Sequence, residues 1–382
     1  MKPIVALLTI LLLAPLVAVH AADAPAMINL RQPPYSAAAD EMKDDRPALG
    51  AAFSAAKKGD TVFVPAGNYR IVLPQGARLS MPDGVALVGE KGLSRFILVS
   101  DGDDKSHREF LLPGSDSVIQ GIHFSKEGTF PAVLFPLFGD RDGIVFRDCV
   151  FDGGSEEFPG RYCHCFQVGN GALKNLVMER IVLRGFTFGL FQANTARGSV
   201  KGVRVVQSLF ERNTASDLEF NSPNGEMTDI EVRDCIFRDN LSKSASGGFA
   251  VGFANVKRGS VERCRIEGYG AEALHVEDRS EDILLKGNTI IGGSKIQPNG
   301  VILVMSDSRK VTIEGNYIDG RPNGNKPHLI LVTAGGNAFP NPSGVLVKDN
   351  VLVNGEKTKA WYLQPGSGPE PMGNILVMPD GK

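Results

Sequence analysis

The 382-residue chain has 41 Lys and Arg residues against 43 Asp and Glu residues, which gives a formal net charge of −2. Its residues are 42% hydrophobic and 22% charged, as is typical of a folded protein. The near-neutral balance, without a basic block, argues against a protein that binds nucleic acid or an anionic membrane through its charge.

The first segment has the features of a secretory signal peptide. Lys2 precedes an apolar run over residues 4–19, and small residues surround a cleavage point before Ala22. This run is shorter than the roughly twenty residues that a membrane-spanning helix needs. We therefore expect residues 1–21 to be removed, residues 22–43 to form a linker, and the mature chain to be secreted or periplasmic without a membrane span.

A short helix, a strand and a tight turn are expected next. Residues 48–58 are rich in alanine, with Pro47 suited to a first helical turn and Gly59 to a C-terminal stop. Residues 61–64 have the composition of a strand and lead into a Pro-x-Gly-x-Tyr sequence at residues 65–69. The helix would shield the open end of a repetitive core.

A strand-and-turn pattern recurs through the rest of the chain. Each copy has alternating apolar residues, a small or polar residue, another apolar residue, and then Gly, Asp or Asn; clear copies begin at Ile144, Ile230 and Val345. Aligned copies lie 24 to 34 residues apart, with a second short strand between them. Helix-length amphipathic stretches are absent, so each repeat is expected to hold at least two strands.

Repeats of this kind must stack to bury their apolar faces. Leucine-rich repeats need spaced leucines and a helical segment, and propeller blades need four strands in about forty residues. Neither pattern is visible. The repeat therefore predicts an all-β fold, a single-stranded parallel β-helix with a short N-terminal capping helix. Residues 44–382 would form this one domain, with an N-terminal cap at 44–70 and a C-terminal tail at about 356–382.

One position of the repeat forms what we call the inward column. Small and amide side chains there would face the interior and stack along the axis. This assignment makes the cysteines buried free thiols, because vertically stacked strands orient Cys235 and Cys264 poorly for a disulfide. The aligned residues are Ile122, Cys149, Ile181, Ser208, Cys235, Cys264, Asn288, Asn316 and Asn350.

Residues 44–70 and 79–89 resemble the entry segment of the pectate lyase-like superfamily of right-handed β-helix proteins. In that superfamily a short helix caps the N-terminal end, and the first strand leads through a Pro-x-Gly-x-Tyr turn. The resemblance implies a right-handed coil and carbohydrate chemistry along the stacked strands. The Asn-Thr-Asp, Gly-His-Gly and Arg-Ile-Lys motifs of polygalacturonases and the Arg-x-Pro-x-x-Arg signature of pectate lyases are absent, so no specific enzyme family is matched.

Uneven spacing between the two strands of a turn predicts a groove. The loops at 152–164 and 238–248 are long and should form walls beside the outer face of the second strand. Strand alternation places Leu218 and Leu274 inward. The same alternation places five polar residues outward: Asp217, Glu219, Asn221, His275 and Glu277.

Three of these residues are the expected catalytic groups: Asp217, Glu219 and His275. Neighbouring carboxylates raise one another's pKa, which suits either a general acid with a base partner or a Ca²⁺ site, and His275 would carry protons. Calcium therefore stays open as a cofactor, and no metal ligands are assigned. The expected substrate-binding residues are Arg161, Tyr162, His164, Asn221, Lys243 and Glu277.

The expected function is an exported polysaccharide-active protein, a glycoside hydrolase or polysaccharide lyase that acts on an acidic glycan. Two alternatives remain: the acidic residues form a solvated outer face, or the same face binds glycan or protein without catalysis. Apolar residues such as Leu303 and Leu331 would reach the outer face in later turns. That face predicts a cover by the C-terminal tail, or a homo-oligomer in place of a monomer.

Overall fold

The computed structural model describes residues 24–102, 105–155, 162–192, 197–222, 224–243, 248–297, 299–322, 328–336, 339–354 and 359–378. The predicted signal peptide lies outside these residues. None of the helices in the described part is long and apolar enough to span a membrane.

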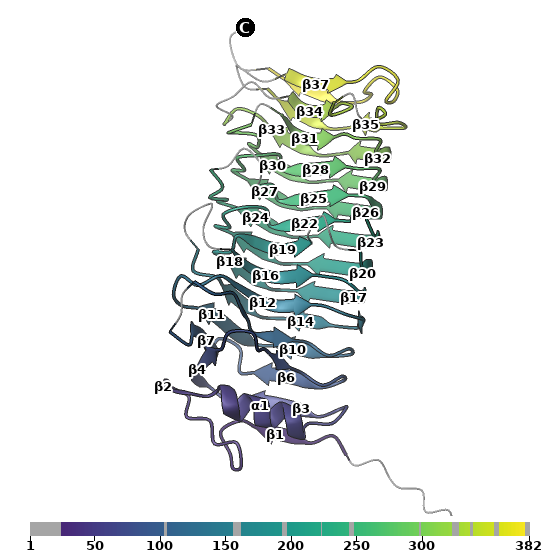
Figure 1. Ribbon diagram of the computed structural model, residues 1–382. Helices are drawn as coiled ribbons and strands as arrows, with labels where there is room; N and C mark the ends of the chain where they lie inside the picture. Colours follow the sequence, from purple (N-terminus) through teal and green to yellow (C-terminus); the bar gives the residue numbers. More distant parts are fainter. Residues whose placement is uncertain are drawn as a thin grey trace, which may run out of the picture.

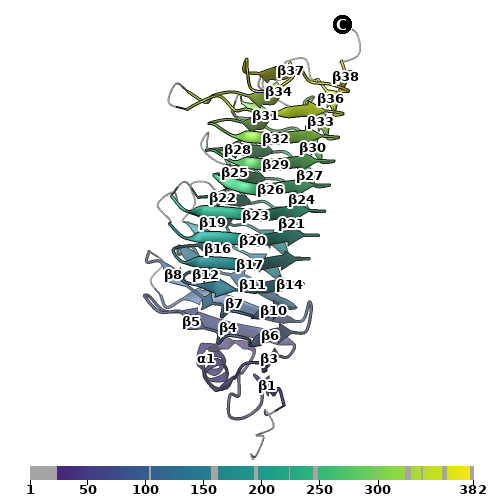
Figure 2. The ribbon, with the colours of Figure 1, turned by 90° about the vertical axis from the view of Figure 1, so that its right-hand side faces the viewer.

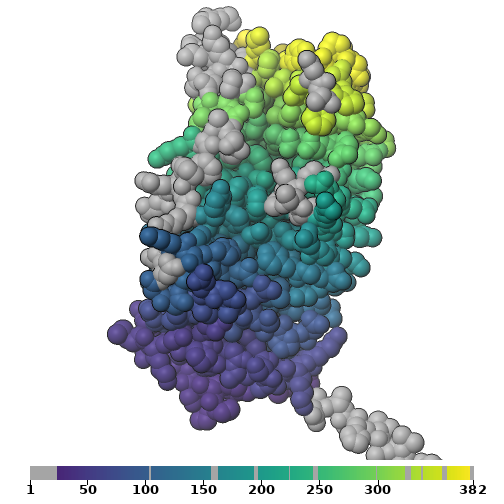
Figure 3. Space-filling view, in the orientation of Figure 1, coloured from purple at the N-terminus to yellow at the C-terminus, as the bar shows by residue number. Residues whose placement is uncertain are grey.

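The chain coils into a β-helix in which all strand pairs of the three long sheets are parallel, as Figure 1 shows from one side and Figure 2 from another. The all-β prediction with a single short capping helix is thus confirmed for the described residues. From residue 86 onward each complete turn holds three strands, one per sheet. The space-filling view shows the colours changing in bands along the molecule, as expected when each turn contacts mainly its neighbours (Figure 3).

The strands of each sheet are as follows. The first sheet contains β1 (Met27–Asn29), β3 (Thr61–Val64), β6 (Ala86–Gly89), β10 (Val118–Gln120), β13 (Arg141–Asp142), β14 (Val145–Arg147), β17 (Ala172–Glu179), β20 (Ser199–Val206), β23 (Glu226–Arg233), β26 (Val256–Glu262), β29 (Glu281–Lys286), β32 (Arg309–Glu314) and β35 (Leu346–Lys348). The second contains β2 (Asp40–Asp44), β4 (Gly67–Leu73), β7 (Ser94–Ser100), β11 (Ile122–Lys126), β15 (Val150–Asp152), β18 (Val182–Arg184), β21 (Leu209–Glu211), β24 (Ile236–Arg238), β27 (Arg265–Glu267), β30 (Thr289–Ile291), β33 (Tyr317–Asp319), β36 (Val351–Val353) and β38 (Ile375–Val377). The third contains β8 (Arg108–Glu109), β12 (Ala132–Leu137), β16 (Cys163–Val168), β19 (Phe188–Gln192), β22 (Leu218–Asn221), β25 (Val251–Ala254), β28 (Leu274–Glu277), β31 (Gly300–Val304), β34 (His328–Val332) and β37 (Lys359–Leu363), while β5 (Leu79–Ser80) and β9 (Leu111–Leu112) form a separate pair.

The chain bends between the first and second sheets at the inward column. Gln207, Asp234 and Gly287 each directly precede a member of that column, and their φ angles lie between 51° and 65°. This left-handed conformation is easiest for Gly, Asn and Asp, which explains why such residues punctuate the repeat. The bend divides the longer predicted strand into two, so a turn has three strands.

The inward column is buried, as predicted, and its amides bond along the axis. All nine members are at most 4% exposed. Oδ1 of Asn316 accepts hydrogen bonds from the backbone N–H of Asn288 at 2.9 Å and from its Nδ2 at 3.0 Å. Asn316 in turn donates from Nδ2 to Oδ1 of Asn350 at 3.0 Å, and Asn374 extends the series by one turn. The described cysteines are all free and buried.

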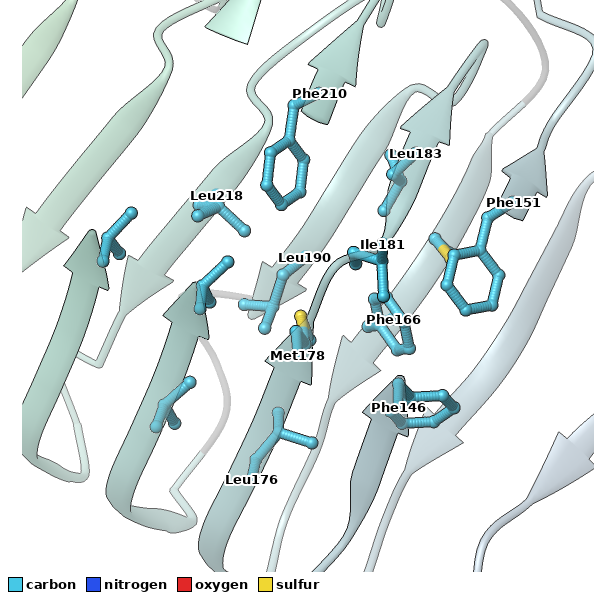
Figure 4. Packing of buried hydrophobic residues seen from close by; sticks show 14 of the residues in the cluster. Phe146, Phe151, Phe166, Leu176, Met178, Ile181, Leu183, Leu190, Phe210 and Leu218 are labelled. Atoms are coloured by element: carbon cyan, nitrogen blue, oxygen red, sulfur yellow. The ribbon is translucent and has the colours of Figure 1, made fainter. Parts of the chain in front are cut away.

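Aromatic rings fill the interior of the earlier turns. Phe146, Phe151 and Phe166 come from the first, second and third sheets and point toward one another (Figure 4). The ring centroids of Phe146 and Phe166 lie 4.8 Å apart, and those of Phe151 and Phe166 lie 5.3 Å apart, both in edge-to-face geometry. These contacts tie the three sheets together and give the outer strand faces a rigid support.

Both ends of the molecule differ from the sequence-based boundaries. The cap helix α1 spans Arg46–Ala55 in place of the predicted residues 48–58, because the backbone is already extended at Ala56. The region predicted as a linker is not one, since β1 pairs with β3 and β2 pairs with β4. Backbone pairing onto the first turn is what orders this segment.

The described part of the C-terminal segment, residues 359–378, extends the coil and does not fold back over it. β37 pairs with β34, which aligns Leu331 with Tyr362, and β38 pairs with β36. The predicted cover of the later outer face by this tail is therefore wrong. Its strands satisfy their backbone groups by adding to the sheets, as unpaired sheet edges favour.

The asparagine series gives a stability prediction. In Asn316→Ala, the backbone N–H and the Nδ2 of Asn288 both lose their buried acceptor. We expect the free energy of unfolding to fall by about 3 kcal/mol, because each unsatisfied buried group costs about 1–3 kcal/mol. Urea unfolding measures the loss, and the exposed Asn341→Ala is the control. Equal urea unfolding midpoints for the two variants would contradict a contribution of the asparagine series to stability.

Candidate active site on the third sheet

The candidate site lies on the outer face of β22, β25 and β28, which follow one another up the third sheet in Figure 1. Their register aligns Glu219, Gly252 and His275 in one column. Two residues further along, Asn221, Ala254 and Glu277 form a second column. The predicted alternation is correct here: the inward neighbours Leu218, Phe220, Leu274 and Val276 are at most 1% exposed.

A pocket of about 240 Å³ opens between these columns. This volume is somewhat below the roughly 300–1,000 Å³ of typical small-molecule sites, so the pocket has room for one unit of a longer chain. It is lined by Glu219, Phe220, Asn221, Phe249, Gly252, Phe253, Ala254, His275 and Glu277.

Gly252 makes the pocket possible. A Cβ atom at this position would collide with the ring of Phe249. The Phe249 ring therefore packs against the backbone of β25 between the turns of Glu219 and His275. It also lies over the His275 ring, with centroids 5.3 Å apart and planes tilted by 30°. The result is an apolar wall between two ionisable groups.

His275 lies between two carboxylates. Its Nε2 is 3.2 Å from Oε2 of Glu277, and its Nδ1 is 3.5 Å from Oε2 of Glu272. Burial lowers the pKa of His275, but the two carboxylates outweigh burial and raise this pKa to about 10. Burial raises the pKa of Glu272 and of Glu277. The interaction with His275 lowers both pKa values by more than burial raises them, so each lies below its ordinary range. At neutral pH His275 is thus a cation and both partners are carboxylates.

Glu219 has the opposite character. Burial raises the pKa of Glu219 to about 7. The hydrogen bond from Ser216 and the charge of His275 lower this pKa, but burial has the larger effect. Glu219 therefore keeps a proton over much of the neutral range, whereas Glu277 does not. Two carboxyl groups with pKa values pushed apart in one pocket are the usual arrangement of an acid and a base.

Asp217 does not face the groove, so its predicted outward orientation is wrong. It is 1% exposed, and its Oδ1 accepts a hydrogen bond of 2.6 Å from Nδ2 of Asn213. Its Oδ2 accepts a hydrogen bond from the phenol of Tyr269. Asp217 precedes β22 at the corner between two sheets, where strict alternation does not hold. Burial raises its pKa to about 7.

The predicted substrate-binding residues are dispersed. Asn221 and Glu277 line the pocket, while Lys243 is exposed and is not among the pocket residues. Tyr162 is 65% exposed, and His164 is buried against aromatic rings. Arg161 lies outside the described residues, as do residues 156–161 and 244–247 of the two predicted wall loops.

No group of three or more His, Cys, Asp or Glu side chains suited to a metal ion occurs within the described ranges. A calcium requirement therefore remains a prediction, to be tested with a chelator.

Sequence reasoning missed Phe249, Gly252 and Glu272. Gly252 had a usable signal, because a glycine inside a strand often marks the close approach of another group. Glu272 had none: it precedes β28 and is 3% exposed, and Oε1 accepts a hydrogen bond of 2.5 Å from Nδ2 of Asn299 on the next turn. It lies only three residues before His275 in the chain, but no repeat pattern marks the corner that directs its carboxylate to the ring.

Removal of the Glu272 charge should lower the pKa of His275. Among the described residues, Glu272→Gln leaves Glu277 as the one carboxylate within ion-pair distance of His275, so the imidazolium loses one of two ion-pair partners. Titration of the His275 ring by NMR would then show a lower pKa than in the wild-type chain. Glu281→Gln, which changes an exposed pair with Lys310 in the first sheet, serves as the control. An unchanged His275 titration in Glu272→Gln would contradict this assignment.

Comparison with known proteins agrees with this architecture. A family model described as right handed beta helix region matches residues 189–351, which include all three strands of the site. This match supports the resemblance to the pectate lyase-like superfamily of right-handed β-helix proteins.

One relative resembles about half of the chain in sequence. Mannuronan C5-epimerase AlgE1 of Azotobacter vinelandii is 31% identical over 216 residues, a match that covers 50% of this chain and 14% of the epimerase. The chain thus spans a small part of that relative's length.

Two solved structures share the fold over most of both chains. PfbA, a surface adhesin of Streptococcus pneumoniae, has a TM-score of 0.62 and 12% identity and covers 92% of this chain and 91% of its own. DFA-IIIase of Arthrobacter chlorophenolicus A6, solved in complex with GF2, has a TM-score of 0.54 and 13% identity. The match covers 93% of this chain and 96% of the DFA-IIIase chain. At these identities the likeness concerns the fold of the superfamily alone.

Proposed function

We propose that the protein is an exported polysaccharide-active enzyme that hydrolyses glycosidic bonds at the pocket over β22, β25 and β28. The observation that carries the proposal is the pair of unlike carboxyl groups in one pocket. Glu219 retains a proton near pH 7 because burial raises its pKa, and Glu277 is ionised because His275 lowers its pKa.

In this reaction Glu219 is the general acid and Glu277 the general base. Glu219 donates its proton to the glycosidic oxygen as the bond to the leaving sugar breaks. Glu277 takes a proton from the water that attacks the anomeric carbon from the other side. His275, held by Glu272, keeps Glu277 ionised and in place.

We expect inversion at the anomeric carbon, because the two groups do not lie on neighbouring turns. Glu219 and Glu277 lie on strands two turns apart, which separates their backbones by about 10 Å along the axis. Inverting enzymes hold their carboxyl groups about 6.5–9.5 Å apart, whereas retaining enzymes hold them about 5–5.5 Å apart. At the intervening turn, Gly252 lets the Phe249 ring pack against the strand, and the sugar ring would lie in the pocket beside that ring.

The sequence match to a mannuronan C5-epimerase favours a second candidate, the removal of the C5 proton from a uronate. In that reaction the cationic His275 would face the sugar carboxylate, and elimination or epimerisation would follow. The acidic glycan expected from the sequence belongs to this candidate. Near the pocket, however, His275 is already matched by Glu272 and Glu277. This charge balance favours a ring without a carboxylate, and hence hydrolysis.

A panel of neutral and uronate polysaccharides separates these reactions. Hydrolysis releases reducing ends of inverted configuration without an unsaturated sugar, and this is the expected result. Ultraviolet absorbance of an unsaturated product indicates a lyase, and deuterium uptake into intact polymer from heavy water indicates an epimerase. Binding without any turnover would support the non-catalytic alternative. Parallel reactions with calcium and with a chelator test the metal requirement.

A further inference from the structure

The outer face of the third sheet carries a cluster of aromatic rings on β16 and β19, the two turns before the pocket. We call Phe188, Phe191 and His164 the aromatic platform. The ring centroids of Phe188 and Phe191 lie 4.6 Å apart, and the His164 ring lies 4.8 Å from Phe191 and 5.2 Å from Phe188. Both phenylalanines are only partly buried, in contrast to the fully buried core phenylalanines.

The aromatic platform is aligned with the pocket. β19 pairs with β22 through Leu190 and Leu218, so Phe191 is the neighbour of Glu219 on the preceding turn. One turn rises by about 4.8 Å, which is close to the length of one pyranose unit in an extended polysaccharide. A chain laid along the axis with one ring at Glu219 therefore places the adjacent ring at Phe191.

The aromatic platform carries no charge at neutral pH. Its phenylalanines are apolar, and burial lowers the pKa of His164 to about 4, so its ring is neutral. His164 is 7% exposed; its Nδ1 lies 3.3 Å from Oε1 of Gln167, and its Nε2 has no hydrogen-bond partner within the described residues. An apolar surface with a few polar groups beside it suits the C–H face of a sugar whose hydroxyl groups bond at the edge.

We infer that the aromatic platform is a binding subsite for an uncharged sugar ring, next to the ring that undergoes cleavage. The inference rests on the proposed function and adds to it the class of sugar at this position. The polysaccharide lies parallel to the helix axis, and a neutral ring stacks on Phe191. A uronate here would bring a carboxylate onto an apolar surface without a cation in the aromatic platform.

The test uses the full chain with Glu219→Gln, so that ligands are bound without turnover. Calorimetry compares cellohexaose, xylohexaose and hexamannuronate, and a neutral hexasaccharide is expected to bind tightest. In the same background, Phe191→Ala should weaken that binding about tenfold. Phe191→Leu, which keeps an apolar side chain but removes the flat ring, should weaken it by a similar factor and guards against loss of folding. Phe339→Ala is the control: Phe339 is 47% exposed and follows β34, five turns from β19 in the pairing order.

The outcomes separate this inference from the proposed function. If a neutral hexasaccharide binds but both Phe191 variants bind it as well as their parent, the subsite is overturned and the proposed function stands. Tightest binding of hexamannuronate also overturns the subsite and favours uronate chemistry. Absence of binding by all three hexasaccharides overturns both.

Discussion

Glu219→Gln is expected to lower the turnover number about 10²- to 10⁴-fold on whichever polysaccharide the wild-type chain cleaves. Glutamine keeps the shape of the side chain but has no acidic proton to give to the leaving oxygen, and general acid catalysis contributes about this factor. The Michaelis constant should change little, because the sugar still meets the same pocket walls.

The pH dependence of the wild-type reaction gives an independent check. A general acid works in its protonated form, and burial raises the pKa of Glu219 to about 7. Turnover should therefore fall as the pH rises through about 7. The residual activity of Glu219→Gln should lack this decrease.

Glu226→Gln is the matched control, since Glu226 is an exposed glutamate at the start of β23 in the first sheet. Equal unfolding midpoints for the two variants would establish that both are folded. Turnover of Glu219→Gln within about twofold of the control would rule out Glu219 as the acid.

Asp217→Asn is expected to be more stable than the wild-type chain above neutral pH. The difference in the free energy of unfolding between the two proteins should be about 4 kcal/mol larger there than at acidic pH. In the folded state burial raises the pKa of Asp217 from 3.8 to about 7. The protonated form is thus the one that the fold favours. Its contribution to stability is fully present below about pH 4 and is lost as the pH rises to about 7, a change of about 4 kcal/mol.

Asparagine preserves the buried contacts without titrating. Its amide oxygen accepts from Asn213 as the carboxyl oxygen does, and its amide nitrogen faces the hydroxyl oxygen of Tyr269. Urea unfolding of both proteins between pH 4 and pH 8 measures the difference. Asp239→Asn, at an exposed carboxylate next to the same corner, is the control. If the free energies of unfolding of Asp217→Asn and of the wild-type chain change in parallel with pH, Asp217 does not titrate with a raised pKa in the folded state.

The stacking of the chain was largely predictable from its sequence. The inward column and the alternation of Leu218, Phe220, Leu274 and Val276 are buried as predicted, and the column of Glu219 and His275 has the predicted spacing of two turns. Each of these features depends on a period that repeats along the chain. Periodic burial can be recognised in a sequence because every turn meets nearly the same surroundings.

The composition of the site depends on contacts that do not repeat. Asp217 turns into the interior at a corner, Phe249 folds back over Gly252, and Glu272 reaches His275 from before its strand. Corners and loops differ in length from turn to turn, so no period relates their side chains to one another. The strand pattern thus fixes which residues share a face. The packing of unequal corners in three dimensions fixes which carboxyl group keeps its proton, because that depends on burial and on neighbouring charges.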